Sequence, residues 1–414
     1  MNSIKNFDIF SCLLVLSLMC IGLVNIYSAT YVEGMSFFSL NNFFGKQVFY
    51  FFICLVTFFL CMIPDIKIYF QYGSIVYLLM IFLLIGVLFF GNEVNGSRSW
   101  FSIAGFSFQP SEFMKPVTAL ALAKFLSNIH SDIKKLSIQF YSFLIISIPL
   151  ILIVIQPDPG TALVFLGFYL VLHIVGLPSI YMNIFTAIII IFLLTIFFGK
   201  TNMLLLTGLL FVLLFIYRLY NSLKKTKLIY YAISSIVFIL CVDFIFNNIF
   251  EQRHRDRFNV VLGLDEDLKG IGYNTNQSQL AFKSGGIFGE GFLQGSQTKG
   301  DFIPEQHSDY IFATIGEEWG FVGSLTTIII FCILLLRIIE RTSIQRNLFH
   351  KIYSYCVITL ILFHFGINIS MVIGIFPSVG IPLPFISYGG SSMLAFTILF
   401  AGYIKIDSNK KEKW

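Results

Sequence analysis

A series of long apolar runs constrains the fold of this chain more than any other feature. Twelve runs have the roughly 17 to 25 residues that a helix needs to cross the hydrocarbon core of a bilayer. Only 12% of the 414 residues are charged, about half the share that soluble chains carry. We therefore predict an all-α, polytopic helical membrane protein of about twelve spans, forming a single integral membrane domain over residues 1–414. The predicted spans are 9–28, 47–64, 70–90, 111–127, 138–155, 160–176, 180–198, 202–217, 228–248, 310–336, 352–374 and 387–405.

The distribution of basic residues indicates how the chain is oriented. If the N-terminus is cytoplasmic, most Lys and Arg residues fall in inner segments, and the short outer loops hold only Lys46, Arg98 and Lys200. Short cytoplasmic loops carry such an excess of basic residues, so we expect both termini in the cytoplasm. The net charge of +5 follows from this asymmetry, and no nucleic-acid partner is expected. The first span is longer than the apolar region of a cleaved signal peptide and is interpreted as a retained anchor.

One long extracytoplasmic loop is predicted at 249–309. It is polar, rich in glycine and charged in both signs, and loops much longer than about 15 residues are usually functional or disordered. The stretch from Gly270 to Gly300 mixes aromatic residues with glycine, which favours an ordered surface. Lys283 and Lys299 in this loop can bind phosphate as point charges.

Ionisable residues lie where the chain is otherwise apolar. A charged side chain at membrane depth costs at least about 2.5–3.5 kcal/mol, so it suggests a function. Glu112 and Lys115 are three residues apart and can neutralise one another on one helix face. A purely structural ion pair is the alternative interpretation. The full set of candidates is Glu112, Lys115, Asp158, Asp243, Glu317 and Glu318.

Residues that flank this pair have ordinary interpretations as well as functional ones. Arg98 and Trp100 shortly precede it, and they are either interfacial anchors or part of a polar pocket shared with Glu112 and Lys115 at the outer leaflet. Asp158 lies in a proline-rich turn, where it is either a helix cap or a site residue.

A second group of ionisable residues precedes the tenth span. Glu305, His307 and Asp309 converge at the outer membrane boundary, but their spacing gives no evident third ligand for zinc. Asp309 has the best position for acid/base catalysis because it directly precedes a helix. Further along, glycines and prolines break the stretch 374–391, which contains Ser387. Non-helical backbone at this depth is tolerated where it lines a cavity, so we predict a cavity facing the outer leaflet.

Taken together in this order, these motifs resemble the SEDS family (shape, elongation, division and sporulation), and its RodA members more than its FtsW members. The resemblance covers about residues 95–392. The matching stretches are Asn95 to Trp100, Gln109 to Glu112 with Lys115, Gln156 to Asp158 with Gly160 and Thr161, Gly272 to Asn274 with Gln277 and Ser278, Ser284 to Gly286, Pro304 and Glu305 with His307 and Asp309, Gly316 to Glu318, and Pro384 to Ser391.

The resemblance implies a peptidoglycan glycosyltransferase of the bacterial cytoplasmic (inner) membrane that polymerises lipid II for cell elongation or division. It makes Asp309 the general base. Trp100, Glu112, Lys115 and Asp158 match other positions that the family needs. A divalent metal ion, Mg or Mn with unknown ligands, is a further expectation, and no organic cofactor is expected.

The expected partners are lipid II, a class B penicillin-binding protein that supplies transpeptidase activity, and other membrane proteins of the elongation complex. The chain departs from the family in its span count, because the family has ten spans and twelve are predicted. The extra pair would lie within 178–225. Two alternative functions stay open: a flippase for the lipid-linked precursor, since broken helices with buried charges also mark transporters, and a non-catalytic scaffold of the cell-wall synthesis complex.

Overall fold

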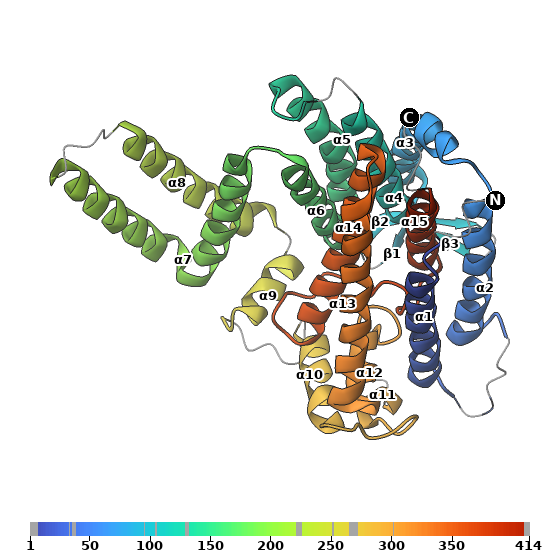
Figure 1. The fold of residues 1–414 in the computed structure, drawn as a ribbon. Coiled ribbons are helices and arrows are strands. Elements are labelled where there is room, and N and C mark those ends of the chain that lie inside the picture. The colour runs from blue at the N-terminus through green and yellow to red at the C-terminus, as the bar shows by residue number, and fades with distance from the viewer. Residues whose placement is uncertain are drawn as a thin grey trace. The chain divides into compact units, whose positions relative to one another are not determined.

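The computed structural model describes residues 7–409 except 33, 35–38, 95, 104–105, 129–131, 221–225, 251, 265–271 and 301. The described residues are largely helical, which confirms the predicted fold class (Figure 1). The helices are α1 (Ile9–Ala29), α2 (Phe43–Met62), α3 (Ile66–Phe90), α4 (Pro110–Ser127), α5 (Leu136–Ile155), α6 (Pro159–Val175), α7 (Ser179–Tyr220), α8 (Thr226–Phe244), the π-helix η2 (Ile245–Ile249), α9 (Gln252–Val261), α10 (Tyr273–Gly285), α11 (Ser296–Lys299), α12 (Ile311–Glu318), α13 (Gly320–Ile344), α14 (Leu348–Val372) and α15 (Gly390–Ser408).

Most of the long helices are apolar along their length. Within the described ranges, eight helices are long and apolar enough to cross a membrane, namely α1, α2, α3, α5, α7, α8, α13 and α14. The apolar helix α6 is shorter, while α4 and α15 carry charged residues. Every predicted span falls largely on helix, but 180–198 and 202–217 share α7, and 310–336 covers both α12 and α13. The exact number of helices that cross the bilayer stays a prediction.

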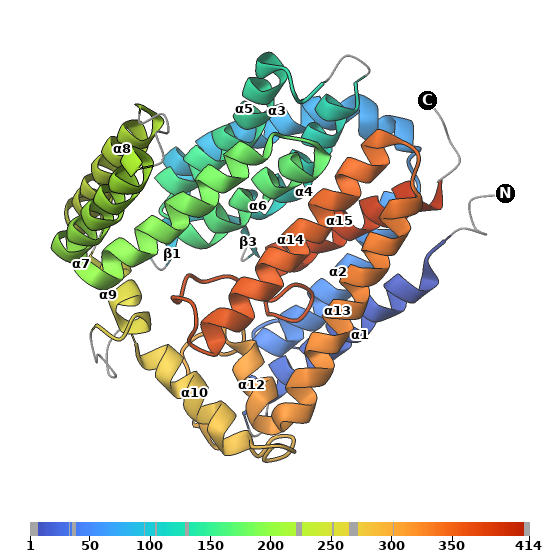
Figure 2. The same cartoon turned by 60° about the vertical axis from the view of Figure 1, so that its left-hand side comes forward.

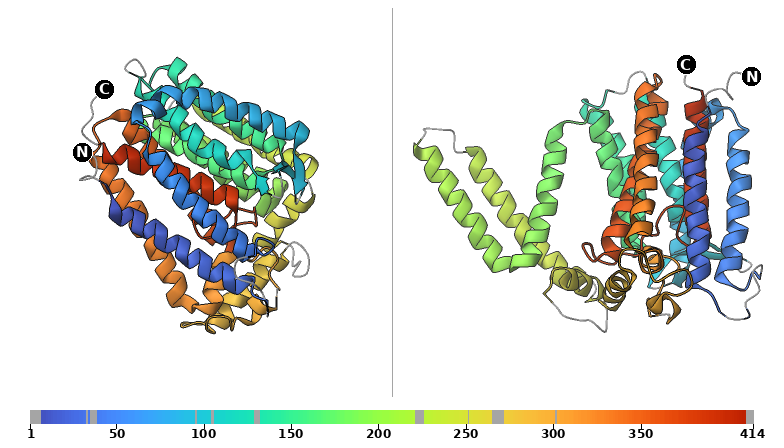
Figure 3. Two further views of the ribbon diagram at one scale, coloured as in Figure 1. Left: turned by 90° about the vertical axis from the view of Figure 1, so that its right-hand side faces the viewer. Right: turned by 60° about the horizontal axis from the view of Figure 1, so that its bottom comes forward.

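The chain divides into two compact units, residues 1–177 with 274–414 and residues 178–273. In the first unit, the long helices run side by side (Figure 3). The start of α1 and the end of α15 lie at one end of this bundle, where Asp8 and Asp407 both pair with Arg341. The short helices α10, α11 and α12 lie at the other end (Figure 1), where Figure 2 also shows α10 and α12. That the end with both termini faces the cytoplasm stays a prediction.

A small sheet that was not predicted from the sequence precedes α4. Strands β1 (Asn92–Val94), β2 (Ser97–Ile103) and β3 (Phe106–Phe108) pair antiparallel in the order β1-β2-β3. The chain then enters α4 at Pro110, which suits the first helical turn because proline has no N–H to leave unpaired. The sheet thus leads directly into the helix that carries Glu112 and Lys115.

The prediction of one continuous span over 310–336 is wrong, because the helix breaks between α12 and α13. Gly320 has a φ of +66°, and a Cβ at this position would lie 2.3 Å from the backbone nitrogen of Gly289. Only glycine tolerates both the conformation and the close approach. The segment 249–309, predicted as a long loop, contains α9, α10 and α11 within its described residues.

The second unit contains residues 178–225, which the sequence predicts to be an extra helix pair. Within α7, Gly199 has non-helical backbone angles (φ 76°, ψ 156°) and divides the helix into two arms. Lys200, next to the break, forms an ion pair of 2.9 Å with Asp243 of α8, and both side chains are partly exposed. The ring of Phe258 in α9 contacts Phe192 of α7 and Phe246 of η2. The assignment of 178–225 as an insertion stays a prediction.

Candidate functional site

The turn that carries Asp309 is held by three successive backbone carbonyls. The carbonyl of His307 accepts a hydrogen bond from the backbone N–H of Tyr388 at 2.9 Å. The carbonyl of Ser308 accepts one from the Ser387 hydroxyl at 2.6 Å, and the carbonyl of Asp309 accepts one from Asn368 Nδ2 at 2.8 Å. These hydrogen bonds to main-chain carbonyls therefore fix the turn and the position of Asp309 within it.

The carboxylate of Asp309 faces the broken stretch before α15. A Cβ added at Gly380 would lie 3.3 Å from Asp309 Oδ2, so the absence of a side chain at Gly380 leaves room beside the carboxylate. Gly380 has a φ of +71°, a conformation that also favours glycine. Asp309 is half-buried. A general base needs this arrangement, because the protein must hold it in place while its carboxylate still contacts the substrate.

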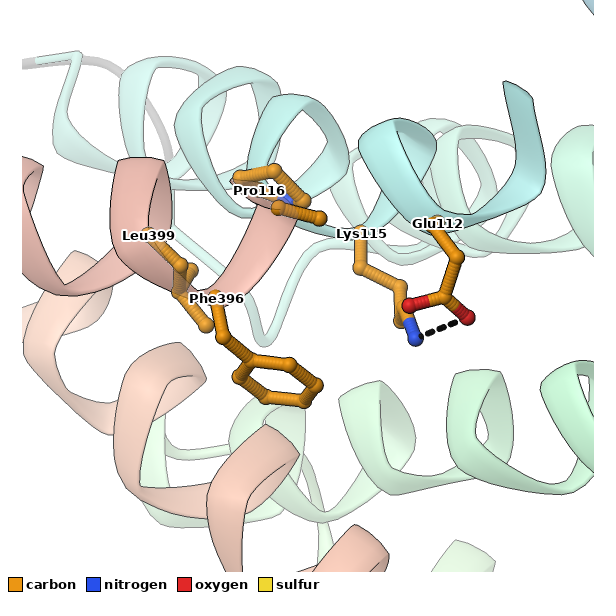
Figure 4. A pocket seen from close by; sticks show the side chains of 6 residues that line it. Glu112, Lys115, Pro116, Phe396 and Leu399 are labelled. Carbon is orange, nitrogen blue, oxygen red and sulfur yellow. Dashed lines mark hydrogen bonds and ion pairs between the residues drawn. The ribbon is translucent and has the colours of Figure 1, made fainter. Parts of the chain in front are cut away.

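Glu112 and Lys115 form a buried ion pair on α4. Lys115 Nζ lies 2.7 Å from Glu112 Oε1, and the two side chains are 2% and 4% exposed. Figure 4 shows them meeting beneath α4, near Phe396 of α15, whose ring centroid is 5.2 Å from Lys115 Nζ. Glu112 Oε2 is buried and has no hydrogen-bond partner among the described residues. The small pocket that these side chains line is too narrow to admit a water molecule.

Asp158 joins the starts of two helices. It is the N-cap of α6, where Oδ1 accepts a hydrogen bond from the backbone N–H of Thr161 at 3.1 Å. Its Oδ2 accepts bonds from Gln109 Nε2 at 3.0 Å and from the Ser111 hydroxyl at 3.4 Å, at the start of α4. Asp158 is therefore a cap, as one interpretation predicted, and it also fixes the helix that carries the ion pair.

Two residues on α14 that were not predicted as site residues join the ion pair to the Asp309 turn. His364 Nε2 lies 2.9 Å from Lys115 Nζ, and His364 Nδ1 lies 3.1 Å from the carbonyl of Pro382. Asn368 contacts the Asp309 carbonyl and also donates to the carbonyl of Ile381 at 2.7 Å. Polar residues four positions apart in an apolar run were a usable signal, because such residues are rare in membrane helices.

The structure brings only some of the other predicted residues to this network. Ser387 is buried there, and the ring of His307 packs against Tyr388 and against Phe43 of α2. Glu305 is exposed and accepts a hydrogen bond from Ser308 at 3.0 Å. Lys299 follows Thr298, whose carbonyl accepts a bond from Gln306 of the Asp309 turn.

The remaining predicted residues lie further out. Lys283 is exposed on the last turn of α10. On β2, Arg98 is exposed and donates to the Leu88 carbonyl at 3.4 Å, and Trp100 is half-buried. Among the described residues, no hydrogen bond or ion pair joins Arg98, Trp100 or Lys283 to the buried ion pair or to Asp309. The predicted shared pocket for Arg98 and Trp100 stays a prediction.

The two acidic residues that end α12 have different environments. Glu317 is fully buried and accepts hydrogen bonds from the backbone N–H groups of Gln297 at 2.6 Å and Thr298 at 2.9 Å, which anchors α11. Glu318 is 1% exposed and accepts a bond from the Ser28 hydroxyl of α1. Its Oε2 has no partner among the described residues.

We expect the Glu318 carboxyl to make stability depend on pH. Burial raises its pKa from 4.5 to about 7, so the folded state binds this proton more tightly than the unfolded state. Stability should therefore fall as pH rises from about 4.5 to about 7, on the order of 1–3 kcal/mol, and then level off. Thermal unfolding of wild type and Glu318→Gln in detergent across this range tests this. The variant should lose that slope, and an unchanged slope in the variant would assign the pH dependence to another group.

The expected divalent metal has no evident protein site. Among the described residues, no group of three His, Cys, Asp or Glu side chains lies close enough together to hold an ion. The metal therefore stays a prediction from the sequence, and no chemical step is assigned to it.

The helical bundle, with a buried ion pair and a carboxylate on an anchored turn, defines a polytopic membrane protein whose polar site lies among its helices. Comparison with known families narrows this class. The profile of the cell cycle protein family FtsW/RodA/SpoVE matches residues 9–207 and 182–412. The chain belongs to this family, which confirms the resemblance read from its motifs.

Curated relatives match over most of their length. The chain is 28% identical to the peptidoglycan glycosyltransferase RodA of Treponema pallidum, over 99% of each chain. It is 28% identical to the peptidoglycan glycosyltransferase MrdB of Escherichia coli, over 83% of this chain and 80% of that one. It is 32% identical to the stage V sporulation protein E of Bacillus subtilis, over 93% of each.

Solved structures share the fold. A chain from a peptidoglycan synthase complex that coordinates polymerization and crosslinking aligns with a TM-score of 0.72 at 22% identity, over 98% of this chain and 99% of that one. The rod shape determining protein RodA of Thermus thermophilus aligns with a TM-score of 0.64 at 22% identity, over 98% of each.

Proposed function

We propose that this chain is a peptidoglycan glycosyltransferase that polymerises lipid II into glycan strands during cell elongation. Membership of the FtsW/RodA/SpoVE family supports this, together with relatives that carry this activity in their names. The observation that carries the proposal is the half-buried Asp309 carboxylate on a turn whose main chain is anchored at three successive positions. Such rigid placement is what a general base requires.

In the proposed reaction, a sugar hydroxyl of the acceptor attacks the anomeric carbon of the donor. The hydroxyl proton passes to the Asp309 carboxylate, a new glycosidic bond forms, and the bond to undecaprenyl pyrophosphate breaks with its electron pair leaving on the phosphate oxygen. Attack opposite the leaving group inverts the anomeric centre. Asp309 thus supplies general base catalysis.

The basic residues are proposed to stabilise the leaving group. A departing pyrophosphate gathers negative charge, and preorganised cations away from bulk water stabilise such charge strongly. Lys115 is buried beside Glu112, and its positive charge contributes to the electrostatic potential of the site. The exposed Arg98, Lys283 and Lys299 are available to attract the phosphates as they approach.

The cellular setting is also part of the proposal. We infer a multi-pass protein of the bacterial cytoplasmic (inner) membrane, with both termini cytoplasmic and the Asp309 site at the outer leaflet. The paired ends of α1 and α15 support placing both termini on one side. A class B penicillin-binding protein is the proposed partner, which agrees with the synthase complex that contains a chain of this fold.

A purified system tests the activity. We expect the protein, with its class B partner and a divalent cation, to convert lipid II into glycan polymer and undecaprenyl pyrophosphate. Polymer without added transferases would support the enzyme. Movement of lipid II across vesicle bilayers without polymer would favour the flippase, and neither activity from a well-folded complex would favour the scaffold.

A further inference from the structure

His364 and Asn368 are buried polar residues on one face of α14. They lie four positions apart, a spacing that stacks side chains one turn above another. Their exposed fractions are 1% and 0%. An apolar helix does not bury two polar side chains without partners, because each unpaired group costs about 1–3 kcal/mol. Their partners therefore indicate what the two residues do.

The contacts of His364 determine its hydrogen-bond roles. Nε2 lies 2.9 Å from Lys115 Nζ, and an ammonium group can only donate. Nε2 must therefore accept from Lys115, which leaves the imidazole neutral with its proton on Nδ1. That Nδ1–H points to the carbonyl of Pro382 at 3.1 Å. One ring thus accepts from the buried cation and donates to the broken stretch before α15.

The contacts of Asn368 continue this connection. Its Nδ2 donates to the carbonyls of Asp309 and Ile381, at 2.8 and 2.7 Å, which uses both amide hydrogens. Ile381 directly precedes Pro382, so adjacent carbonyls receive one bond from each α14 residue. A short path of hydrogen bonds therefore runs from Glu112 through Lys115 and His364 to the backbone beside Asp309.

The structure assigns His364 as a positioning residue that acts through Lys115, and this assignment rests on the proposed function. The ion pair with Glu112 alone does not direct Lys115 toward α14, because Glu112 lies on the same helix. His364 gives Nζ a second partner on another element. It thereby fixes the ammonium relative to the Ile381–Pro382 backbone and, through Asn368, relative to the Asp309 turn.

Side chains of matched size separate this role from packing. Glutamine offers an acceptor oxygen and a donor amide, as the neutral imidazole does. Methionine has a similar length but no donor and only a weak acceptor. If hydrogen bonding through Lys115 matters, His364→Gln should work and His364→Met should not.

The test measures steady-state lipid II polymerisation by the complex with its class B partner. We expect His364→Met to lower kcat by about 10- to 100-fold, the effect of misplacing a group by about 1 Å, with KM nearly unchanged. His364→Gln should stay within about threefold of wild type. His173→Leu is a matched control, because it removes a half-buried histidine of α6 that contacts neither Lys115 nor Pro382 in the described structure.

Several outcomes would overturn the assignment. Equal activity of the Met variant and wild type, or equal loss in the Gln and Met variants, would show that hydrogen bonding at position 364 does not matter. Should the Met variant fail to fold, as judged by thermal unfolding, His364→Asn replaces it. The shorter amide cannot span both partners and should lose kcat, and full activity would contradict the assignment. An inactive wild type would instead reject the proposed function.

Discussion

Asp309→Asn is expected to reduce glycan polymerisation by about 10² to 10⁴-fold, the contribution typical of a general base. Asparagine keeps the size of the side chain but cannot accept the proton of an attacking hydroxyl. The carbonyls of residues 307, 308 and 309 accept hydrogen bonds that hold the turn, and the substitution leaves all three carbonyls in place. The variant should therefore fold and keep its partner while losing activity.

The measurement is polymer formation from lipid II by wild type and variant, each with the class B partner. Thermal unfolding and copurification of the partner establish that the variant is intact. Glu340→Gln is the matched control, since it removes one negative charge from an exposed ion pair with Arg337 and should leave activity unchanged. If Asp309→Asn polymerised at the wild-type rate, another group would have to accept the proton.

The sequence predicted the helices well because the membrane imposes a simple rule. Backbone groups in hydrocarbon must be paired within the segment, so a long apolar run such as 138–155 leaves little choice but a helix, here α5. The same physics made Glu112 and Lys115 conspicuous and suggested their pairing at a spacing of three. Both inferences depend on local sequence only.

What the sequence did not predict depends on contacts between distant segments. The break at Gly320 exists because the loop at Gly289 packs against it, and an apolar run gives no sign of that neighbour. Strand β2 forms only by pairing with short flanking strands. The roles of His364 and Asn368 likewise require the stretch at Ile381 and Pro382 to fold back onto α14.

Lys115→Met is expected to destabilise the protein by about 3–5 kcal/mol, because it leaves Glu112 as an unpaired buried acid. Methionine fills nearly the same space, so lost packing contributes little. The free energy of unfolding in mixed detergent micelles measures this. The double variant Glu112→Gln with Lys115→Met removes both charges, and it should recover much of the stability that the single variant loses.

A comparison with an exposed ion pair decides whether burial causes the loss of stability in Lys115→Met. Lys200→Met breaks the ion pair between Lys200 and Asp243, whose side chains are 46% and 26% exposed, respectively. This substitution should lower the free energy of unfolding by less than about 1 kcal/mol. Equal losses from Lys115→Met and Lys200→Met would mean that water reaches the α4 pair. If the double variant is stable but makes no polymer, the pair is kept for catalysis, because a structural ion pair can be replaced by uncharged side chains without loss of activity.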